Sequence, residues 1–308
     1  MNTVAVVLNA PQSLALREIE LTQPGDGDVV VDVAWSGIST GTERLLWDGR
    51  MPPFPGMGYP LVPGYESVGR VTQAGPSSGM KVGQTVFVPG ARCYGEVHGL
   101  FGGAASRVVT PASRVIPIPE GLRERGVLMA LAATAHHAVA GGLPDLIVGH
   151  GVLGRLIARI AVAQGGAPVV WEKNAQRAGG SFRYAVTTPE NDPRRNYQRI
   201  CDVSGDSKLL DALIQRLAPA GEIVLAGFYS EPLSFSFPPA FMREARIRIA
   251  AEWKPDDLVK TRALVESGRL SLDGLITHKR SAEDAADAYR LAFDDPSCLK
   301  MILEWRKS

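Results

Sequence analysis

A glycine-rich hexapeptide near the middle of the chain has the residue types and spacing to bind a pyrophosphate. It reads Gly149-His150-Gly151-Val152-Leu153-Gly154. The run DLIV precedes it, and the helical segment VLGRLIARIAVAQGG overlaps and follows it. Glycines in this context permit a tight turn and let backbone amides approach a phosphate, and the start of the helix presents further free amides. The pattern therefore predicts a dinucleotide site; the alternative is a turn that binds nothing.

An acidic residue lies where such a site would need one. Glu172 ends the next predicted strand, 18 positions after Gly154. A carboxylate at this place accepts hydrogen bonds from the adenosine ribose hydroxyls and repels a 2′-phosphate. The position favours NAD over NADP as the cofactor, although the neighbouring Lys173 and Arg177 argue mildly the other way. The predicted chemistry is hydride transfer by a nicotinamide.

Hydroxyl and carboxylate side chains gather in two short segments nearer the N-terminus. They are SGISTGTE, residues 36–43, and GYESVG, residues 64–69. Oxidation of an alcohol removes a hydride from the carbon and a proton from the hydroxyl. Hydrogen-bonding groups in a cleft orient the alcohol and pass its proton to an acceptor.

The order of predicted elements tells which domains position these groups. Residues 1–120 contain short strands such as DVVVDVAW and SVGRVTQAG, separated by glycine and proline turns. From residue 122 onward strands alternate with helices such as KLLDALIQRLAPAG, which predicts a parallel sheet covered on both faces. The last segment, a strand and a helix, returns to the character of the first domain. We predict an α/β protein with one domain at 1–121 and 269–308 and another at 122–268.

Composition bounds the remaining possibilities. The chain has 308 residues, enough for about two domains, and a formal net charge of +1, which indicates no polyanionic partner. It contains no run of about 18 apolar residues that would span a membrane, and we find no signal peptide at its N-terminus. The three scattered cysteines fit a reducing cytoplasm without disulfides. We expect a cytoplasmic location.

The histidines are weaker candidates for chemistry. His136 and His137 are neighbours on a predicted helix, so they should project about 100° apart and not face one site. His150 should lie near the cofactor without catalytic duty. We expect His278 to be structural, and His98 to lie on a loop that could line the cleft.

The chain resembles the medium-chain dehydrogenase/reductase superfamily over nearly its whole length. The N-terminal domain is similar to the GroES-like catalytic domain of that family, and residues 122–268 to its doubly wound Rossmann domain. LAPAGEIVLAG resembles the late strand beside the nicotinamide, and LITHKRSAEDAADAYRLA the returning C-terminal part. The resemblance adds five cofactor-binding residues to the glycine motif and Glu172–Lys173: Ser204, Ala226, Gly227, Phe228 and Lys300.

The resemblance also shows where a catalytic zinc would bind. Thr40, or Ser39 if the alignment shifts by one residue, stands at the family's cysteine position, and Tyr65 stands at its histidine position. No Cys, Glu or Asp lies just before Thr134 to supply a third ligand, and Cys93 alone replaces the four-cysteine structural site. We therefore expect no metal, as in the zinc-free branches of the family.

Without zinc, other groups must handle the alcohol. Thr42 occupies the family's proton-relay position, and Tyr65 could bind the substrate oxygen. Glu66 and Glu43 could accept the proton or support the groups that do. The alternatives are that Tyr65 only fills the space of the metal, that Glu66 is structural, and that Thr40 caps a turn.

A narrower resemblance concerns the substrate. The segment SGISTGTERLLWDGRMPPFPGMGYPLVPGYESVGRV is similar to the branch that oxidises the C3 1-hydroxyethyl group of bacteriochlorophyllide a to acetyl. This implies NAD as acceptor and a tetrapyrrole alcohol as substrate. Apolar and aromatic residues here could form a wall for its ring, or could pack only on their own domain. The proposed wall is Trp47, Phe54, Met57 and Tyr59, with Met51 nearby. Arg44 and Arg50 could pair with the propionate.

Two other functions remain open, a zinc-free enone or quinone reductase and a dinucleotide-binding protein without catalytic activity.

We expect the protein to be a homodimer that pairs through the strand ARIRIAAEW.

Overall fold

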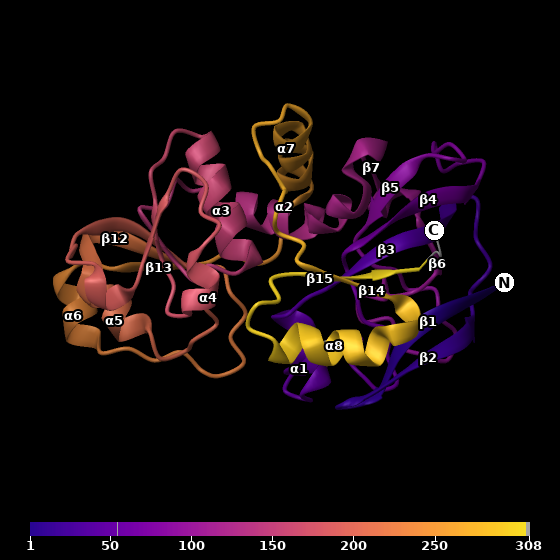
Figure 1. Ribbon diagram of the computed structural model, residues 1–308, viewed down its shortest axis with the longest axis horizontal. Coiled ribbons are helices and arrows are strands. Elements are labelled where there is room, and N and C mark those ends of the chain that lie inside the picture. Colours follow the sequence, from indigo (N-terminus) through magenta and orange to yellow (C-terminus); the bar gives the residue numbers. More distant parts are fainter. Residues whose placement is uncertain (54, 306–308) are drawn as a thin grey trace. The chain divides into compact units, whose positions relative to one another are not determined.

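The computed structural model describes residues 1–53 and 55–305, which form two compact units (Figure 1). The first unit comprises Met1–Ala130 and Leu275–Ser308, and the second comprises Leu131–Gly274. The domain boundaries expected from the sequence, after residues 121 and 268, lie a few residues earlier. Within the described ranges no helix is long and apolar enough to span a bilayer.

The first unit is β-rich. Its strands are β1 (Asn2–Ala10), β2 (Ser13–Glu20), β3 (Asp28–Ile38), β4 (Ser67–Ala74), β5 (Thr85–Val88), β6 (Arg107–Pro111), β7 (Ile116–Pro117), β14 (His278–Ser281) and β15 (Met301–Glu304). Its helices are α1 (Thr42–Trp47) and α8 (Ala285–Asp294), with 3₁₀ turns at Ala112–Arg114, Glu120–Leu128 and Ala282–Asp284. Helix α2 (Met129–Ala138) begins in this unit.

Strand β3 is the centre of the larger sheet of this unit. The strand order is β14-β15-β3-β4-β5-β7, and β6 also pairs with β3. Val29, Val30, Val31 and Val33 of this strand are buried in the core. The C-terminal strand β15 pairs with β3 so that Met301 lies opposite Ile38. Residues more than 260 positions apart are therefore neighbours, and the end of β3 lies beside the start of β15.

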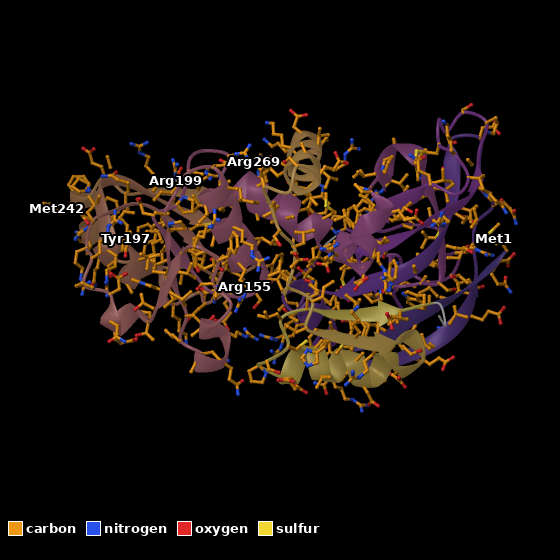
Figure 2. The ribbon with its side chains drawn as sticks, turned by 45° about the horizontal axis from the view of Figure 1, so that its top comes forward. Met1, Arg155, Tyr197, Arg199, Met242 and Arg269 are labelled. Atoms are coloured by element: carbon orange, nitrogen blue, oxygen red, sulfur yellow. The ribbon has the colours of Figure 1, made fainter. Side chains whose placement is uncertain are left out.

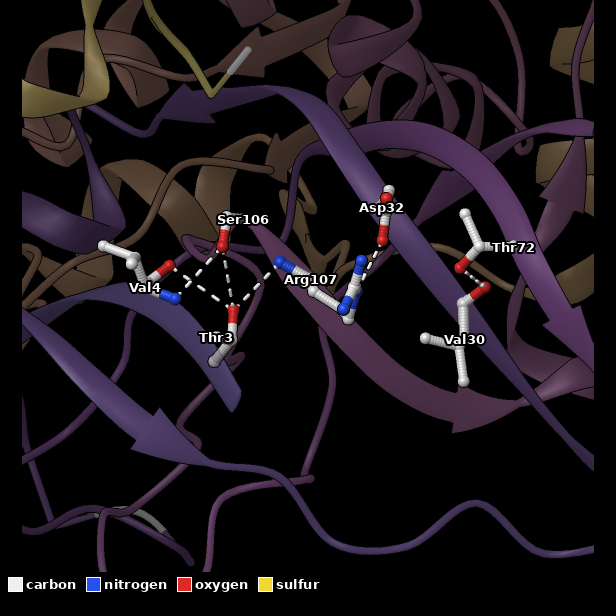
Figure 3. Close-up of polar contacts among 7 residues, drawn as sticks. All are labelled: Thr3, Val4, Val30, Asp32, Thr72, Ser106 and Arg107. Atoms are coloured by element: carbon white, nitrogen blue, oxygen red, sulfur yellow. Dashed lines mark hydrogen bonds and ion pairs between the residues drawn. The ribbon is translucent and has the colours of Figure 1, made fainter. Parts of the chain in front are cut away.

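Polar contacts join β1 to this sheet (Figure 3). The Thr3 and Ser106 hydroxyl oxygens lie 3.2 Å apart, and the amides of Val4 and Arg107 each donate to one of them. The Arg107 guanidinium also donates to Asp32 on β3 over 2.6 Å. These bonds fasten the start of β1 to β6 and, through Arg107, to β3.

The second unit is a doubly wound α/β domain. Its strands are β8 (Leu146–Val148), β9 (Val169–Trp171), β10 (Ala185–Thr187), β11 (Tyr197–Asp202), β12 (Leu217–Leu225) and β13 (Arg246–Ile249). Its helices are α3 (Val152–Ala163), α4 (Ala175–Ala178), α5 (Leu210–Arg216), α6 (Phe237–Met242) and α7 (Pro255–Glu266), with a 3₁₀ turn at Pro189–Asn191. The sheet is wholly parallel, in the order β10-β9-β8-β11-β12-β13.

This order confirms the predicted fold class. The order in which the strands are added to the sheet reverses between β8 and β11. Doubly wound sheets bind dinucleotides at such a switch point, beyond the carboxyl ends of the strands. One expected helix is shorter than predicted, because α5 ends at Arg216 and Leu217 already begins β12. Pro219 cannot continue a helix, and Leu217 is buried in the sheet core.

Candidate functional site

A cluster of hydroxyl groups lies where β3 ends and α1 begins. The Tyr65 phenol oxygen lies 2.7 Å from the Ser39 hydroxyl oxygen and is also hydrogen-bonded to the side chain of Thr42. Thr42 is the first residue of α1, and partly exposed Thr40 precedes it. The structure thus brings together Tyr65 and Thr42, two of the predicted catalytic residues, with Ser39. Their catalytic roles, and that of Thr40, stay predictions.

A buried carboxylate lies beneath these hydroxyls. Glu43 has no exposed surface, and its two oxygens accept from the Ser39 amide at 3.1 Å and the Tyr289 hydroxyl at 2.7 Å. Burial raises the pKa of Glu43 from 4.5 to about 7, and the charge of Glu66 acts in the same direction. Glu43 is therefore a group that exchanges a proton near neutral pH.

A second buried carboxylate is held by a buried ammonium group. Glu66 accepts from Lys300 Nζ at 2.7 Å, and the same nitrogen donates to the Ile38 carbonyl at 3.2 Å. Glu66 approaches so closely that a Cβ on Gly37 would lie 2.2 Å from its carboxylate, so only glycine fits there. Burial raises the pKa of Glu66, and the Lys300 ammonium opposes this rise. The Lys300 ammonium thus acts on two carboxylates. It bonds directly to Glu66, and its charge lowers the pKa of Glu43.

Burial also raises the pKa of Tyr65, and the nearby Glu66 adds to the effect. The phenol therefore stays protonated, with one O–H to donate and an oxygen that can accept. Its ring packs edge-on against Phe101, with the ring centres 5.0 Å apart. Tyr65 consequently joins a polar cluster on one side to an apolar surface on the other.

The predicted substrate wall continues this apolar surface. Trp47, Met57 and Tyr59 are partly buried around the same small cluster as Phe101, together with Met51. The Tyr59 hydroxyl donates to the Leu46 carbonyl. Phe54, the fourth residue of the predicted wall, lies outside the described residues. The role of these residues in binding a substrate stays a prediction.

The two arginines near this surface already have partners. Arg50 forms an ion pair with Asp48 at 2.6 Å, while Arg44 lies 3.7 Å from Asp48 and donates to the Phe293 carbonyl at 3.0 Å. Both arginines are exposed, so they could still exchange Asp48 for an anionic ligand.

Within residues 1–53 and 55–305, no group of three or more His, Cys, Asp and Glu side chains is arranged to hold a metal ion. Cys93 is buried and free. The donor groups at the places of the expected zinc ligands are the neutral hydroxyls of Ser39, Thr40 and Tyr65, which are poor zinc ligands.

The second unit contains the glycine cradle that the sequence predicts. Gly149 has φ +106°, a conformation that favours glycine, and a Cβ on Gly154 would lie 1.9 Å from the Gly149 carbonyl oxygen. The N-cap residue of α3 is Gly151, and no atom lies within 4 Å of where its Cβ would be. This open helix N-terminus, with Val152 and Leu153 in its first turn, fits a pyrophosphate.

The other predicted cofactor residues surround this helix end, except one. Glu172 accepts from the His150 amide at 3.0 Å and the Asn174 amide at 2.7 Å, and Lys173 beside it is exposed. Exposed Ser204 follows β11, and Ala226-Gly227-Phe228 follow β12, at the carboxyl ends of neighbouring strands. Lys300 belongs to the first unit, where its ammonium binds Glu66. All of these assignments to the cofactor stay predictions.

One prediction about the histidines is wrong. His136 and His137 do contact one group, because their Nδ1 atoms lie 3.0 and 2.8 Å from the two oxygens of Asp257. A carboxylate is wide enough to meet two side chains that diverge from one helix. The bonds join α2 to α7 within the second unit. His98 is exposed, and His278 lies 2.9 Å from the Thr277 hydroxyl.

Sequence reasoning missed Tyr289 as a member of the site. It lies on the buried face of α8 with Ala285, Ala288 and Ala292, a spacing typical of an amphipathic helix. That pattern shows that Tyr289 faces the core. It does not show that the partner is Glu43, which lies 246 positions away.

Comparison with known proteins identifies the family. Residues 25–120 match the alcohol dehydrogenase GroES-like domain. The chain is 58% identical to the 2-desacetyl-2-hydroxyethyl bacteriochlorophyllide A dehydrogenase of Cereibacter sphaeroides, over 99% of both chains. It is 59% identical to the protein of the same name from Rhodobacter capsulatus, again over 99% of both. The chain belongs to this dehydrogenase family.

The family lies within the medium-chain dehydrogenase/reductase superfamily, as its resemblance implies. A solved structure with the same fold is an Escherichia coli alcohol dehydrogenase in complex with NADH. It covers 99% of both chains, with a TM-score of 0.84 and 22% identity. Similarity at this level confirms the GroES-like and Rossmann architecture.

Replacing Glu43 by Gln should remove a pH dependence of stability. The folded-state pKa of Glu43 is raised, so its contribution to stability is complete below pH 4.5 and is lost as pH rises through about 7. Gln imitates the protonated carboxyl. Its oxygen still accepts from the Ser39 amide, and its NH₂, like the carboxyl O–H, donates to the Tyr289 hydroxyl oxygen, which then accepts in place of donating. We expect the free energy of unfolding of the wild type to fall by up to about 3 kcal/mol more than that of Glu43→Gln between pH 5 and 8.

Urea unfolding at both pH values measures this difference. Glu96→Gln, at an exposed position, is the control and should follow the wild type. Parallel pH dependence of wild type and Glu43→Gln would show that Glu43 does not titrate in this range.

Proposed function

We propose that this protein oxidises the 1-hydroxyethyl group of bacteriochlorophyllide a, or of a chlorophyllide analogue, to an acetyl group with NAD as hydride acceptor. The observation that carries the proposal is the 58–59% identity, over nearly the whole chain, to two dehydrogenases named for that substrate. The hydroxyl and carboxylate cluster of the first unit and the glycine cradle of the second are the two parts that such a reaction needs.

The residues of the second unit fit a nicotinamide dinucleotide. Gly149 and Gly154 allow the close backbone packing that a pyrophosphate requires, and Gly151 leaves the N-terminus of α3 open. The Glu172 carboxylate is fixed by two backbone amides at the end of β9. We assign it to the adenosine ribose, where its charge disfavours a 2′-phosphate. When bound, the nicotinamide would accept the hydride.

The first unit supplies groups for the proton. We assign Tyr65 and Thr42 to bind the alcohol oxygen by hydrogen bonds, and we assign Glu43 as the group that receives the proton. Glu43 suits this role because its pKa of about 7 lets it both accept and release a proton near neutral pH. Glu66 is less suited, because Lys300 holds it as an ion pair.

The apolar surface beside Tyr65 suits a large planar substrate. Trp47, Met57 and Tyr59 are only partly buried, and Phe101 connects them to the Tyr65 ring. A macrocycle on this surface would bring a peripheral alcohol near the phenol. Arg44 or Arg50 would bind its propionate in place of Asp48.

Turnover of the named alcohol tests the function. The purified protein, incubated with NAD and 2-desacetyl-2-hydroxyethyl bacteriochlorophyllide A, should form NADH and the acetyl product in equal amounts. A red shift should report the product, because the new carbonyl is conjugated with the ring. Tyr65→Phe should lower kcat about tenfold, the effect of one lost hydrogen bond, and leave the KM for NAD unchanged.

The matched control is Tyr197→Phe, which loses a hydroxyl bonded to Asp192 in the second unit. Its kcat should stay within about twofold of wild type. Absence of both products in the wild type would refute the proposed function. Unchanged kcat in Tyr65→Phe would leave that phenol only a space-filling role.

Replacing Glu172 by Ala tests the choice of cofactor. The variant should bind NAD about tenfold more weakly and discriminate less against NADP, because the ribose acceptor and the repulsive charge are both lost. Dissociation constants for both cofactors, measured by calorimetry, check this. A wild type that already prefers NADP would contradict the assignment of NAD.

We further propose that the protein works as a homodimer in the cytoplasm. Strand β13 lies at the edge of its sheet, and Ile249 on it is 75% exposed. Met242 (Figure 2) and Phe241 on nearby α6 are 76% and 66% exposed. An open strand edge beside apolar side chains is a natural surface for pairing with a second copy.

Light scattering coupled to size exclusion tests this assembly. The wild type should elute with twice the chain mass. Ile249→Lys should shift it toward the monomer, while Val259→Lys, an exposed substitution on α7, should not. A wild type that is monomeric at all concentrations would refute the dimer.

A further inference from the structure

His150, the second residue of the glycine motif, is wholly buried within the second unit. Its Nδ1 lies 2.6 Å from the Arg177 carbonyl oxygen, and its Nε2 lies 2.8 Å from the Tyr184 hydroxyl. A carbonyl oxygen only accepts, so Nδ1 carries the proton and Nε2 accepts from Tyr184. Burial lowers the pKa of His150 to about 4, which keeps the ring neutral and this tautomer in place.

Both contacts of the ring go to one segment, residues 174–184, which follows Glu172 and includes α4. Arg155, on the first turn of α3 (Figure 2), holds the same segment. Its guanidinium donates to the carbonyls of Arg177, Gly179 and Gly180 at 2.8, 2.8 and 3.1 Å. It also donates to the His150 carbonyl at 3.0 Å. The segment and the glycine motif are thus bonded at several points.

The backbone of His150 completes the connection. Its amide donates to one oxygen of Glu172, while the other oxygen accepts from the Asn174 amide. The direction of the Glu172 carboxylate therefore depends on the glycine motif on one side and on the start of the 174–184 segment on the other. The His150 ring fixes the distance between these two supports.

We propose that His150 is a positioning residue for the adenosine half of the dinucleotide site. Its ring holds the 174–184 segment against the glycine motif, so that Glu172 stays directed at the ribose position. This inference rests on the proposed use of NAD. It assigns no contact between the His150 ring and the cofactor, because the ring is buried and both of its nitrogens already have protein partners.

The main test replaces His150 by Phe, which keeps an aromatic ring and removes both hydrogen bonds. The dissociation constant for NAD, measured by calorimetry, should rise about tenfold, and the preference over NADP should narrow. The kcat at saturating NAD should change less than about twofold. Tyr184→Phe loses one of the two bonds and should raise the dissociation constant about threefold.

A control variant and a second measurement distinguish a positioning role of His150 from a purely structural one. Arg159→Lys is the control, because Arg159 lies one turn further along α3 and binds the carbonyls of Ser271 and Asp273. It should lower the melting temperature without changing NAD affinity. Trypsin should cleave His150→Phe faster than the control after exposed Arg183, since the segment is released.

Each outcome decides the proposal. Lower melting temperature with unchanged NAD affinity in both His150→Phe and Tyr184→Phe would overturn it. If His150→Phe does not fold, the affinity and cleavage of Tyr184→Phe decide alone. A wild type that binds no NAD would instead refute the proposed function, because the binding measurement needs no tetrapyrrole.

Discussion

One buried ammonium group, on Lys300, determines how the polar centre of the first unit is built. It lies between the Ile38 carbonyl and Glu66, with a second buried carboxylate, Glu43, close enough to sense both charges. Removing one partner from a buried ion pair typically costs 3–5 kcal/mol, so each of these groups holds the others in place. The arrangement requires the pairing of β15 with β3 and a glycine at position 37, where any side chain would enter the carboxylate.

The same charge balance gives the two carboxylates different behaviour. Glu66 has the ammonium as a direct partner and belongs to the permanent framework. Among the described residues, Glu43 accepts from two neutral donors, Tyr289 and the Ser39 amide, and burial brings its pKa to about 7. Two acids of similar chemistry thus differ in their partners, since Glu66 is bonded to an ammonium group and Glu43 to neutral donors. The hydroxyls of Tyr65, Ser39 and Thr42 form a hydrogen-bonded cluster of their own near these two acids.

Much of the fold was predictable, because it follows from local patterns. The strand–glycine–helix context of residues 146–163 and the alternation of strands and helices gave the doubly wound domain. The chemistry at the site was less accessible, since its partners are far apart in sequence. Tyr289 meets Glu43, and Lys300 meets Glu66, only because the C-terminal segment returns to the first sheet. The error at His136 and His137 has another cause. Helical geometry gives the directions in which the two side chains leave the helix, but it does not show that one carboxylate, on Asp257, can bond to both of them.

We propose that hydroxyls and a carboxylate act here without a metal. Zinc acidifies a bound alcohol, whereas a site without metal would orient the alcohol and remove its proton by hydrogen bonds alone. Measuring zinc per chain in active enzyme, together with turnover before and after a strong chelator, tests this most directly. We expect no stoichiometric zinc and unchanged turnover. About one zinc per chain, lost together with turnover on chelation, would contradict the claim.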